Sequence, residues 1–123
     1  MRDRSRIETG RQGENLAADY LKRRGYRIIE RNYRCSLGEI DIVALQGDVV
    51  VFIEVKTRRS ERFGEPQQSV TLEKQRRISR ISLEYLQKKR LYPCNARFDV
   101  VAVKMQGGDA GIELIQNAFD LAF

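Results

Sequence analysis

Two short apolar runs, separated by a polar turn sequence, dominate the pattern of this chain. Residues 38–44 read Gly-Glu-Ile-Asp-Ile-Val-Ala, residues 49–56 read Val-Val-Val-Phe-Ile-Glu-Val-Lys, and Gln46-Gly47-Asp48 lies between them. Runs rich in β-branched residues on either side of a glycine-containing turn predict a β-hairpin. A two-residue turn at Gly47 and Asp48 would place Asp41 opposite Glu54 and Glu39 opposite Lys56. A register slipped by two residues would keep all four on one face, because side chains alternate along a strand.

Helical periodicity appears on both sides of this hairpin. The first predicted helix has a capping-box sequence at residues 9–12, an apolar stripe that includes Leu16 and Leu21, and Gly25 as its stop. A second helix is expected from about Ser69 or Thr71 to Lys89. Further strands are expected at residues 26–33, 97–104 and 112–116, where β-branched and aromatic residues gather.

The resulting order, α-β-β-β-α-β-β, predicts an α/β fold with a central mixed β-sheet and flanking helices. A parallel pair of strands across the second helix requires a right-handed crossover, which a helix of this length can provide. We expect residues 1–8 to be a flexible N-terminal arm and residues 9–123 to be a single domain. The polar stretch 57–68 reads as a loop, and 117–123 as an apolar tail.

Composition narrows the classes of function. The chain has 23 Lys and Arg against 17 Asp and Glu, a net charge of +6, which favours a polyanionic partner such as nucleic acid. No apolar run is long enough to span a membrane, and no secretory leader is visible, so we expect a cytoplasmic protein without a membrane partner. The absence of histidine excludes Ser-His and Cys-His catalysis. Cys35 and Cys94 are expected to be free thiols at strand ends.

Asp41, Glu54 and Lys56 are the leading candidates for chemistry. Two carboxylates on strands that are otherwise apolar destabilise the fold unless something such as a metal ion compensates. Carboxylate oxygens are ligands that Mg²⁺ prefers, and a lysine beside them could orient a water or neutralise charge on a phosphate. The alternative is a cross-strand acid pair relieved by one lysine at an exposed sheet edge.

Other charged residues have a functional and a simpler interpretation. Glu14 could bring a third carboxylate to the ion, or complement the dipole of the first helix. Lys74, on the inward side of the second helix, could meet a phosphate or simply extend to solvent. The loop arginines could hold backbone phosphates or be scattered surface charges, and they are Arg58, Arg59 and Arg62.

Two further groups have mainly structural interpretations. Five basic residues on the outer faces of the second helix read as a solvated surface, with contact to a nucleic-acid duplex as the minority option: Arg76, Arg77, Arg80, Lys88 and Lys89. Asp99 is expected in strand pairing or in a buried ion pair with Arg97.

Several separated motifs in this order resemble the YraN-like family of bacterial predicted endonucleases. They are Gly10-Arg-Gln-Gly-Glu14, residues 38–44, Phe52-Ile-Glu-Val-Lys-Thr-Arg58, Lys74, residues 97–103 and Asn117-Ala-Phe119. That family is similar to the restriction-endonuclease-like PD-(D/E)XK superfamily and, within it, to archaeal Holliday-junction resolvases. Ile40 stands where the superfamily's name implies proline.

The resemblance implies roles for individual residues. Asp41 would be the motif aspartate, and Glu54 and Lys56 the acid and lysine of the E-X-K element. The backbone carbonyl of Val55 would be a further metal ligand, and Glu14 would match the first-helix glutamate of the resolvases. The implied activity is an Mg²⁺- or Mn²⁺-dependent DNA endonuclease that leaves a 5′-phosphate and acts on branched or structured DNA.

Two other functions stay open from the sequence. One is a nucleic-acid binding module that keeps the nuclease fold without catalysis. The other is an interaction protein whose apolar tail docks onto another chain or a second copy. A homodimer is compatible with all three functions, since nucleases that cut junctions often match a two-fold substrate.

Overall fold

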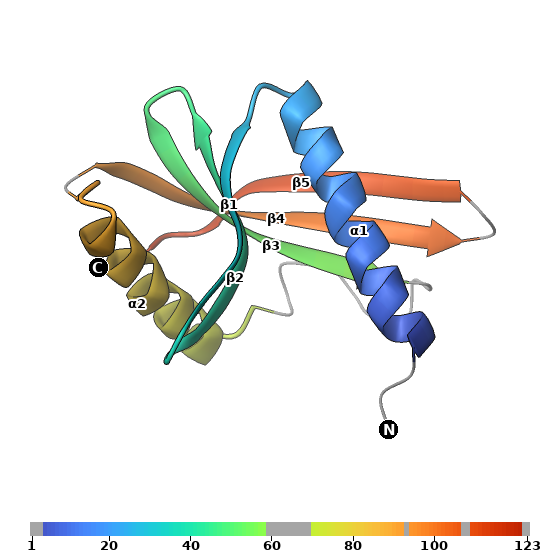
Figure 1. Cartoon of the computed structure of the whole chain (residues 1–123), viewed down its shortest axis with the longest axis horizontal. Coiled ribbons are helices and arrows are strands. Elements are labelled where there is room, and N and C mark those ends of the chain that lie inside the picture. The colour runs from blue at the N-terminus through green and yellow to red at the C-terminus, as the bar shows by residue number, and fades with distance from the viewer. Residues whose placement is uncertain (1–3, 59–69, 93, 107–108, 122–123) are drawn as a thin grey trace.

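One five-stranded mixed sheet with a helix on each face forms the structure, a computed structural model (Figure 1). It describes residues 4–58, 70–92, 94–106 and 109–121. The elements are α1 (Arg4–Arg23), β1 (Arg27–Cys35), β2 (Gly38–Gln46), β3 (Val49–Arg58), α2 (Leu72–Lys88), β4 (Asn95–Gln106) and β5 (Asp109–Phe119). The strands lie in the order β1-β2-β3-β4-β5, and only β3 and β4 pair in parallel. The expected α/β class, element order and parallel pair are confirmed.

The two helices bury different sides of the sheet. Ala17, Ala18 and Leu21 of α1 pack with Ile53 of β3, whereas the apolar face of α2 packs with Phe52. Successive residues of β3 therefore enter opposite cores, as the alternation of side chains along a strand requires. The predicted inward face of α2 is confirmed, since Ile78, Ile81 and Tyr85 are buried. Within the described residues, neither helix is long and apolar enough to span a membrane.

Helix α1 begins earlier than the capping-box sequence predicted. It starts at Arg4 instead of Thr9, so the expected arm at residues 1–8 is helical from Arg4 on. Arginine and glutamate have good helix propensity, and a single internal glycine costs only about 1 kcal/mol, so Gly10 does not end the helix. The C-terminal end is as predicted, because Gly25 takes a φ of +87° and Tyr26 N–H donates to the carbonyl of Leu21.

The β2–β3 hairpin has the predicted register. Gly47 has a φ of +62°, and the pairs run from Gln46–Val49 to Ile42–Ile53. Asp41 and Glu54 come next in this series, but the paired ladder between β2 and β3 stops at Ile42–Ile53 within the described residues. The site described below lies where the two strands stop pairing.

A buried cluster of polar groups connects β4 to Tyr26, which precedes β1, and to Asn117 of β5. Asp99 is fully buried and accepts hydrogen bonds from Tyr26 Oη (2.8 Å), Arg97 Nε (2.8 Å) and the Asn117 backbone N–H (2.9 Å). The expected ion pair of Asp99 with Arg97 is confirmed. Because its carboxylate is satisfied by these donors, Asp99 has a structural role.

The C-terminal residues belong to the protein's own core. The predicted tail at residues 117–123 is wrong for 117–119, which complete β5. The ring centroids of Phe119 and Phe98 lie 4.4 Å apart. Ala118 and Leu121 also pack against the α2-side core. The sequence pattern missed this because two apolar residues, Ala118 and Phe119, are too few to show a period.

We expect Phe119→Ala to lower the free energy of unfolding by about 1–3 kcal/mol, because it removes a half-buried ring packed on Phe98. Urea denaturation measures the change. Leu72→Ala is the matched control, since Leu72 is 60% exposed on α2 and its loss should change stability little. Equal stability of the two variants would contradict the packing role of Phe119.

Candidate metal and nucleic-acid site

Where the backbone pairing of β2 with β3 ends, the Asp41 side chain accepts a hydrogen bond from the backbone of β3. Its Oδ2 accepts a hydrogen bond from the backbone N–H of Val55 at 2.8 Å. Burial raises the pKa of Asp41 to about 6, the Val55 hydrogen bond opposes this shift, and the negative charges of Glu14, Glu54 and Glu39 add to it. The carboxyl group is therefore held where its ionised form is costly.

The local course of β2 explains this position. Ile40 packs in the α2-side core, whereas Ile42 packs in the α1-side core, although a regular strand places residues two apart on the same side. The alternation of side chains thus breaks at Asp41. The strand turns away from β3 there, which leaves a backbone N–H of β3 for the carboxylate.

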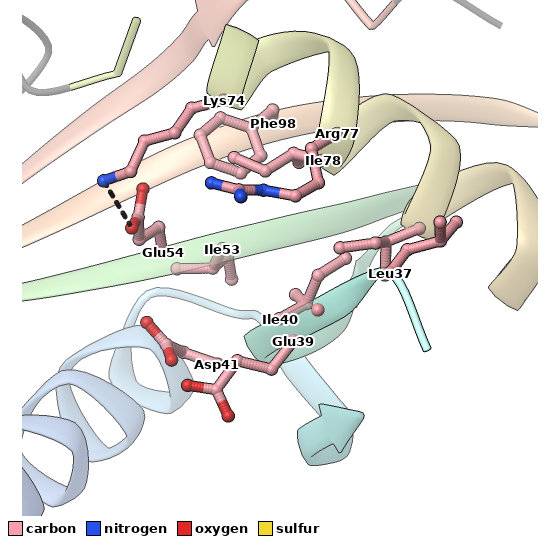
Figure 2. Close-up of a pocket in the computed structure, with 12 residues that line it drawn as sticks. Leu37, Glu39, Ile40, Asp41, Ile53, Glu54, Lys74, Arg77, Ile78 and Phe98 are labelled. Atoms are coloured by element: carbon pink, nitrogen blue, oxygen red, sulfur yellow. Dashed lines mark ion pairs between the residues drawn. The ribbon is translucent and has the colours of Figure 1, made fainter. Parts of the chain in front are cut away.

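Glu54 forms ion pairs with two lysines from different elements. Lys56 of the same strand places its Nζ 3.1 Å from Glu54 Oε1. Lys74 of α2 places its Nζ 3.9 Å from the same oxygen, as Figure 2 shows. Burial lowers the pKa of Lys74, the Glu54 charge opposes this, and the neighbouring Lys56 adds to the lowering. Glu54 Oε2 is buried and has no hydrogen-bond partner among the described residues.

Glu14 approaches the site from α1. Its Oε1 is buried without a hydrogen-bond partner among the described residues and lies 3.8 Å from the Arg31 guanidinium of β1. Arg31 also donates to Asn15 Oδ1 at 2.9 Å. The charge of Glu14 contributes to the raised pKa of Asp41, so α1 brings a third carboxylate into the neighbourhood of Asp41.

Gly13 allows α1 to come this close. A Cβ built on Gly13 would overlap the side chain of Thr57 in β3, at a separation that real Cβ atoms do not show. A Cβ on Gly10 would meet nothing within 4 Å. The helix therefore needs glycine at position 13 to pack on β3, and this contact lies one residue before Glu14.

The oxygen atoms at this site suit a hard divalent cation that takes only a few of its ligands from the protein. Asp41 and Glu54 offer carboxylate oxygens, and one buried oxygen each of Glu14 and Glu54 has no hydrogen-bond partner among the described residues. In the described ranges, no three acidic or cysteine side chains converge closely enough to hold an ion together. Mg²⁺ commonly uses one or two carboxylates and keeps several waters, so this arrangement suits it.

Some expected neighbours lie elsewhere. Glu39 pairs with Arg34 of β1 at 3.0 Å, so the expected position opposite Lys56 is wrong because the ladder ends before it. Arg58 is half-buried at the end of β3, whereas Arg59 and Arg62 lie outside the described residues. Cys35 and Cys94 are free thiols, as expected.

A cleft of about 270 Å³ opens beside the carboxylates (Figure 2). Its polar end contains Asp41, Glu54 and Lys74, and its walls include Ile40 and Ile78. Apolar walls lower the local dielectric and strengthen the interactions of charges placed there. The cleft runs between β2 and α2, with Arg77 on its α2 side.

A family model described as "Uncharacterised protein family UPF0102" matches residues 13–103. The chain belongs to this family. The expected YraN-like membership is thereby confirmed. The matched region spans Glu14, Asp41, Glu54, Lys56 and Lys74.

Relatives within UPF0102 match nearly the whole chain. A UPF0102 protein of Syntrophus aciditrophicus is 58% identical over 95% of this chain and 92% of the relative. One of Geobacter sulfurreducens is 54% identical over 93% and 90%, and one of Caldicellulosiruptor saccharolyticus 46% identical over 91% and 97%. The solved "Crystal structure of SSO0001" is 16% identical with a TM-score of 0.34. The match covers 90% of this chain but only 51% of that one, and a TM-score this low does not establish a shared fold.

The sequence analysis did not assign three residues to this site, namely Gly13, Arg77 and Arg31. Gly13 is one of two glycines inside a helix, and that costly pattern is itself a signal of close packing. Arg77 lies three residues after Lys74, a spacing that puts both on one side of α2. Arg31 gave no signal, because its proximity to Glu14 depends on how α1 packs beside β1.

Proposed function

We propose that the protein is a metal-dependent endonuclease that hydrolyses phosphodiester bonds in DNA, with branched or structured DNA as its substrate. The observation that carries the proposal is the pair of carboxylates, Asp41 and Glu54, at the point where β2 and β3 separate. An exposed structural ion pair would not require a half-buried aspartate with a raised pKa beside a glutamate oxygen without a partner.

Three groups would hold the ion directly, namely Asp41, Glu54 and the Val55 carbonyl, and Glu14 would contact it through a bound water. Within a strand, the N–H and C=O of one residue point to the same side. Because the Val55 N–H meets Asp41, its carbonyl faces the same gap. A bound Mg²⁺ would neutralise phosphate charge and lower the pKa of a water ligand.

The lysines supply positive charge to the reacting phosphate. Lys56 Nζ is within hydrogen-bond distance of Glu54 Oε1, so it lies close enough to the acids to orient a water or to donate to an anionic oxygen. Lys74 approaches the same oxygen from α2. Water is the proposed nucleophile, because none of the described residues at the site is a serine or cysteine.

Cleavage assays test this proposal directly. Purified protein with Mg²⁺ or Mn²⁺ should cut a four-way junction or a flap faster than a linear duplex, and Lys56→Ala should lower the rate by about a hundredfold or more. Arg80→Ala, which removes an exposed charge from α2 outside the cleft, is the control. Cleavage that persists in Lys56→Ala would refute the assignment, and binding without any cleavage would favour the non-catalytic nucleic-acid module.

Calorimetry tests the metal site without a substrate. Mn²⁺ should bind the wild type, and Asp41→Ala should abolish the binding heat. If both proteins take up Mn²⁺ equally, the ion does not use Asp41.

A further inference from the structure

Arg77 lines the cleft beside the proposed metal site, and its side chain is exposed, like those of Arg76 and Arg80. It follows Lys74 by about one helical turn and lines the same cleft as Asp41 and Glu54. Figure 2 shows its guanidinium directed from α2 toward the side of the cleft where Glu54 lies. The expected solvent exposure of Arg77 is confirmed, and the residue also borders the cleft.

The other cations around the site are already engaged by protein acceptors. Lys56 and Lys74 both lie against Glu54 Oε1. Arg31 donates to Asn15, and Arg34 pairs with Glu39. Arg77 forms no hydrogen bond or ion pair in the part of the chain that the structure describes. It therefore keeps the full donor capacity of a guanidinium for a ligand.

The Arg77 stem lies near Gly38, at the start of β2. The φ of Gly38 is +141°, and a Cβ at this position would lie 3.2 Å from Ile81 Cδ1 and 3.8 Å from Arg77 Cδ. The close approach at this position is therefore to Ile81, whereas a side chain here would meet the Arg77 stem only at an ordinary contact distance.

The charges around the cleft indicate what Arg77 binds. A small free anion would be repelled by Glu39, Asp41 and Glu54, which share the cleft with Arg77. A polyanion makes more than one contact, and the net charge of +6 on the protein attracts the phosphates that lie outside the cleft. A guanidinium fork also matches the geometry of phosphate oxygens.

We infer that Arg77 binds a phosphodiester group of the nucleic-acid strand, next to the one placed over Asp41 and Glu54. The identity of the anion rests on the proposed function. The contact is to the backbone, so it should position the strand without reading its sequence.

Binding measured without divalent cations tests the inference independently of cleavage. The probe is a short fluorescein-labelled DNA strand, single or annealed, followed by fluorescence anisotropy in EDTA at several salt concentrations. Arg77→Ala should weaken binding about tenfold and reduce the salt slope by about one phosphate contact. Arg77→Lys should recover part of the affinity, because lysine keeps the charge but loses the fork.

Arg76→Ala is the matched control, since it removes the same charge from the next position of α2 and outside the cleft. The inference is overturned if Arg76→Ala and Arg77→Ala weaken binding equally, or if the wild type binds no DNA. Circular dichroism of each variant checks that α2 stays folded, and Arg77→Gln provides a second, more conservative loss of charge.

The outcomes also separate this inference from the proposed function. A protein that binds through Arg77 but never cleaves DNA would keep the inference and refute the endonuclease. If the wild type cleaves DNA and Arg77→Ala loses no more DNA affinity than Arg76→Ala, the endonuclease stands and the inference about Arg77 is refuted.

Discussion

Asp41→Asn is expected to abolish metal-dependent cleavage and, at the same time, to stabilise the folded protein above neutral pH. Under the proposed function, loss of the Asp41 carboxylate removes a ligand of the ion and should lower the cleavage rate at least about a thousandfold. Asparagine keeps an oxygen that can accept from Val55 N–H, so the local fold should survive. The two effects have opposite signs because the site is built for charge and not for stability.

The stability effect follows from the raised pKa of Asp41. Its folded-state value of about 6 lies above the ordinary value of 3.8, so the native protein binds this proton more tightly than the unfolded chain. This contribution to stability is fully present below about pH 4 and is lost as the pH rises through about 6. Allowing for solvent screening of a partly exposed group, the loss is about 1–3 kcal/mol.

Urea unfolding in EDTA measures this difference. The variant should be more stable than the wild type by about 1–3 kcal/mol near pH 8, and the two should be nearly equal near pH 4. Asp19→Asn, which removes an exposed charge on α1, should show no such pH dependence. A variant less stable than the wild type near pH 8 would show that the Asp41 charge stabilises the fold.

Gly13→Ala is expected to weaken metal binding and destabilise the protein, although alanine is the better helix former. The added methyl group would overlap Thr57, so α1 must move away from β3 and take Glu14 with it. We expect a loss of about 1–3 kcal/mol in unfolding free energy and at least about a tenfold loss in Mn²⁺ affinity. Both quantities are measurable on the same preparation, by urea denaturation and calorimetry.

Two variants separate this contact from general effects of the substitution. Gly10→Ala makes the same change where a Cβ meets nothing within 4 Å, and it should stabilise the helix by about 0.5–1 kcal/mol. Thr57→Gly combined with Gly13→Ala removes the overlap and should restore most of the metal affinity. If the double variant binds Mn²⁺ no better than Gly13→Ala, the position of Glu14 is not set by this contact.

The sequence was sufficient for the fold because its signals are local. Alternating β-branched runs, a glycine turn and an apolar stripe on α2 each depend on neighbours within a few residues. These signals placed every element of the sheet in order and set the register of the β2–β3 hairpin. They were weakest at element ends, where α1 started earlier and β5 ran later than expected.

The candidate residues were also within reach of the sequence, but their arrangement was not. Spacing along β2 and β3 brought Asp41, Glu54 and Lys56 together, and the inward side of α2 added Lys74. The register alone would have paired Asp41 with Glu54 in a regular ladder. It could not show that Asp41 binds the Val55 backbone instead, or that Arg77 enters the cleft.

By itself, the sequence determined the α/β fold, the hairpin and the acids and lysines that gather on it. Periodicity and turn chemistry are properties of short segments, so they can be read without coordinates. Only the tertiary structure decided where β2 leaves β3, how closely α1 approaches through Gly13, and which cation in the cleft lacks a partner. Those features depend on how helices and strands distant in the chain pack together, and no pattern within one segment contains that information.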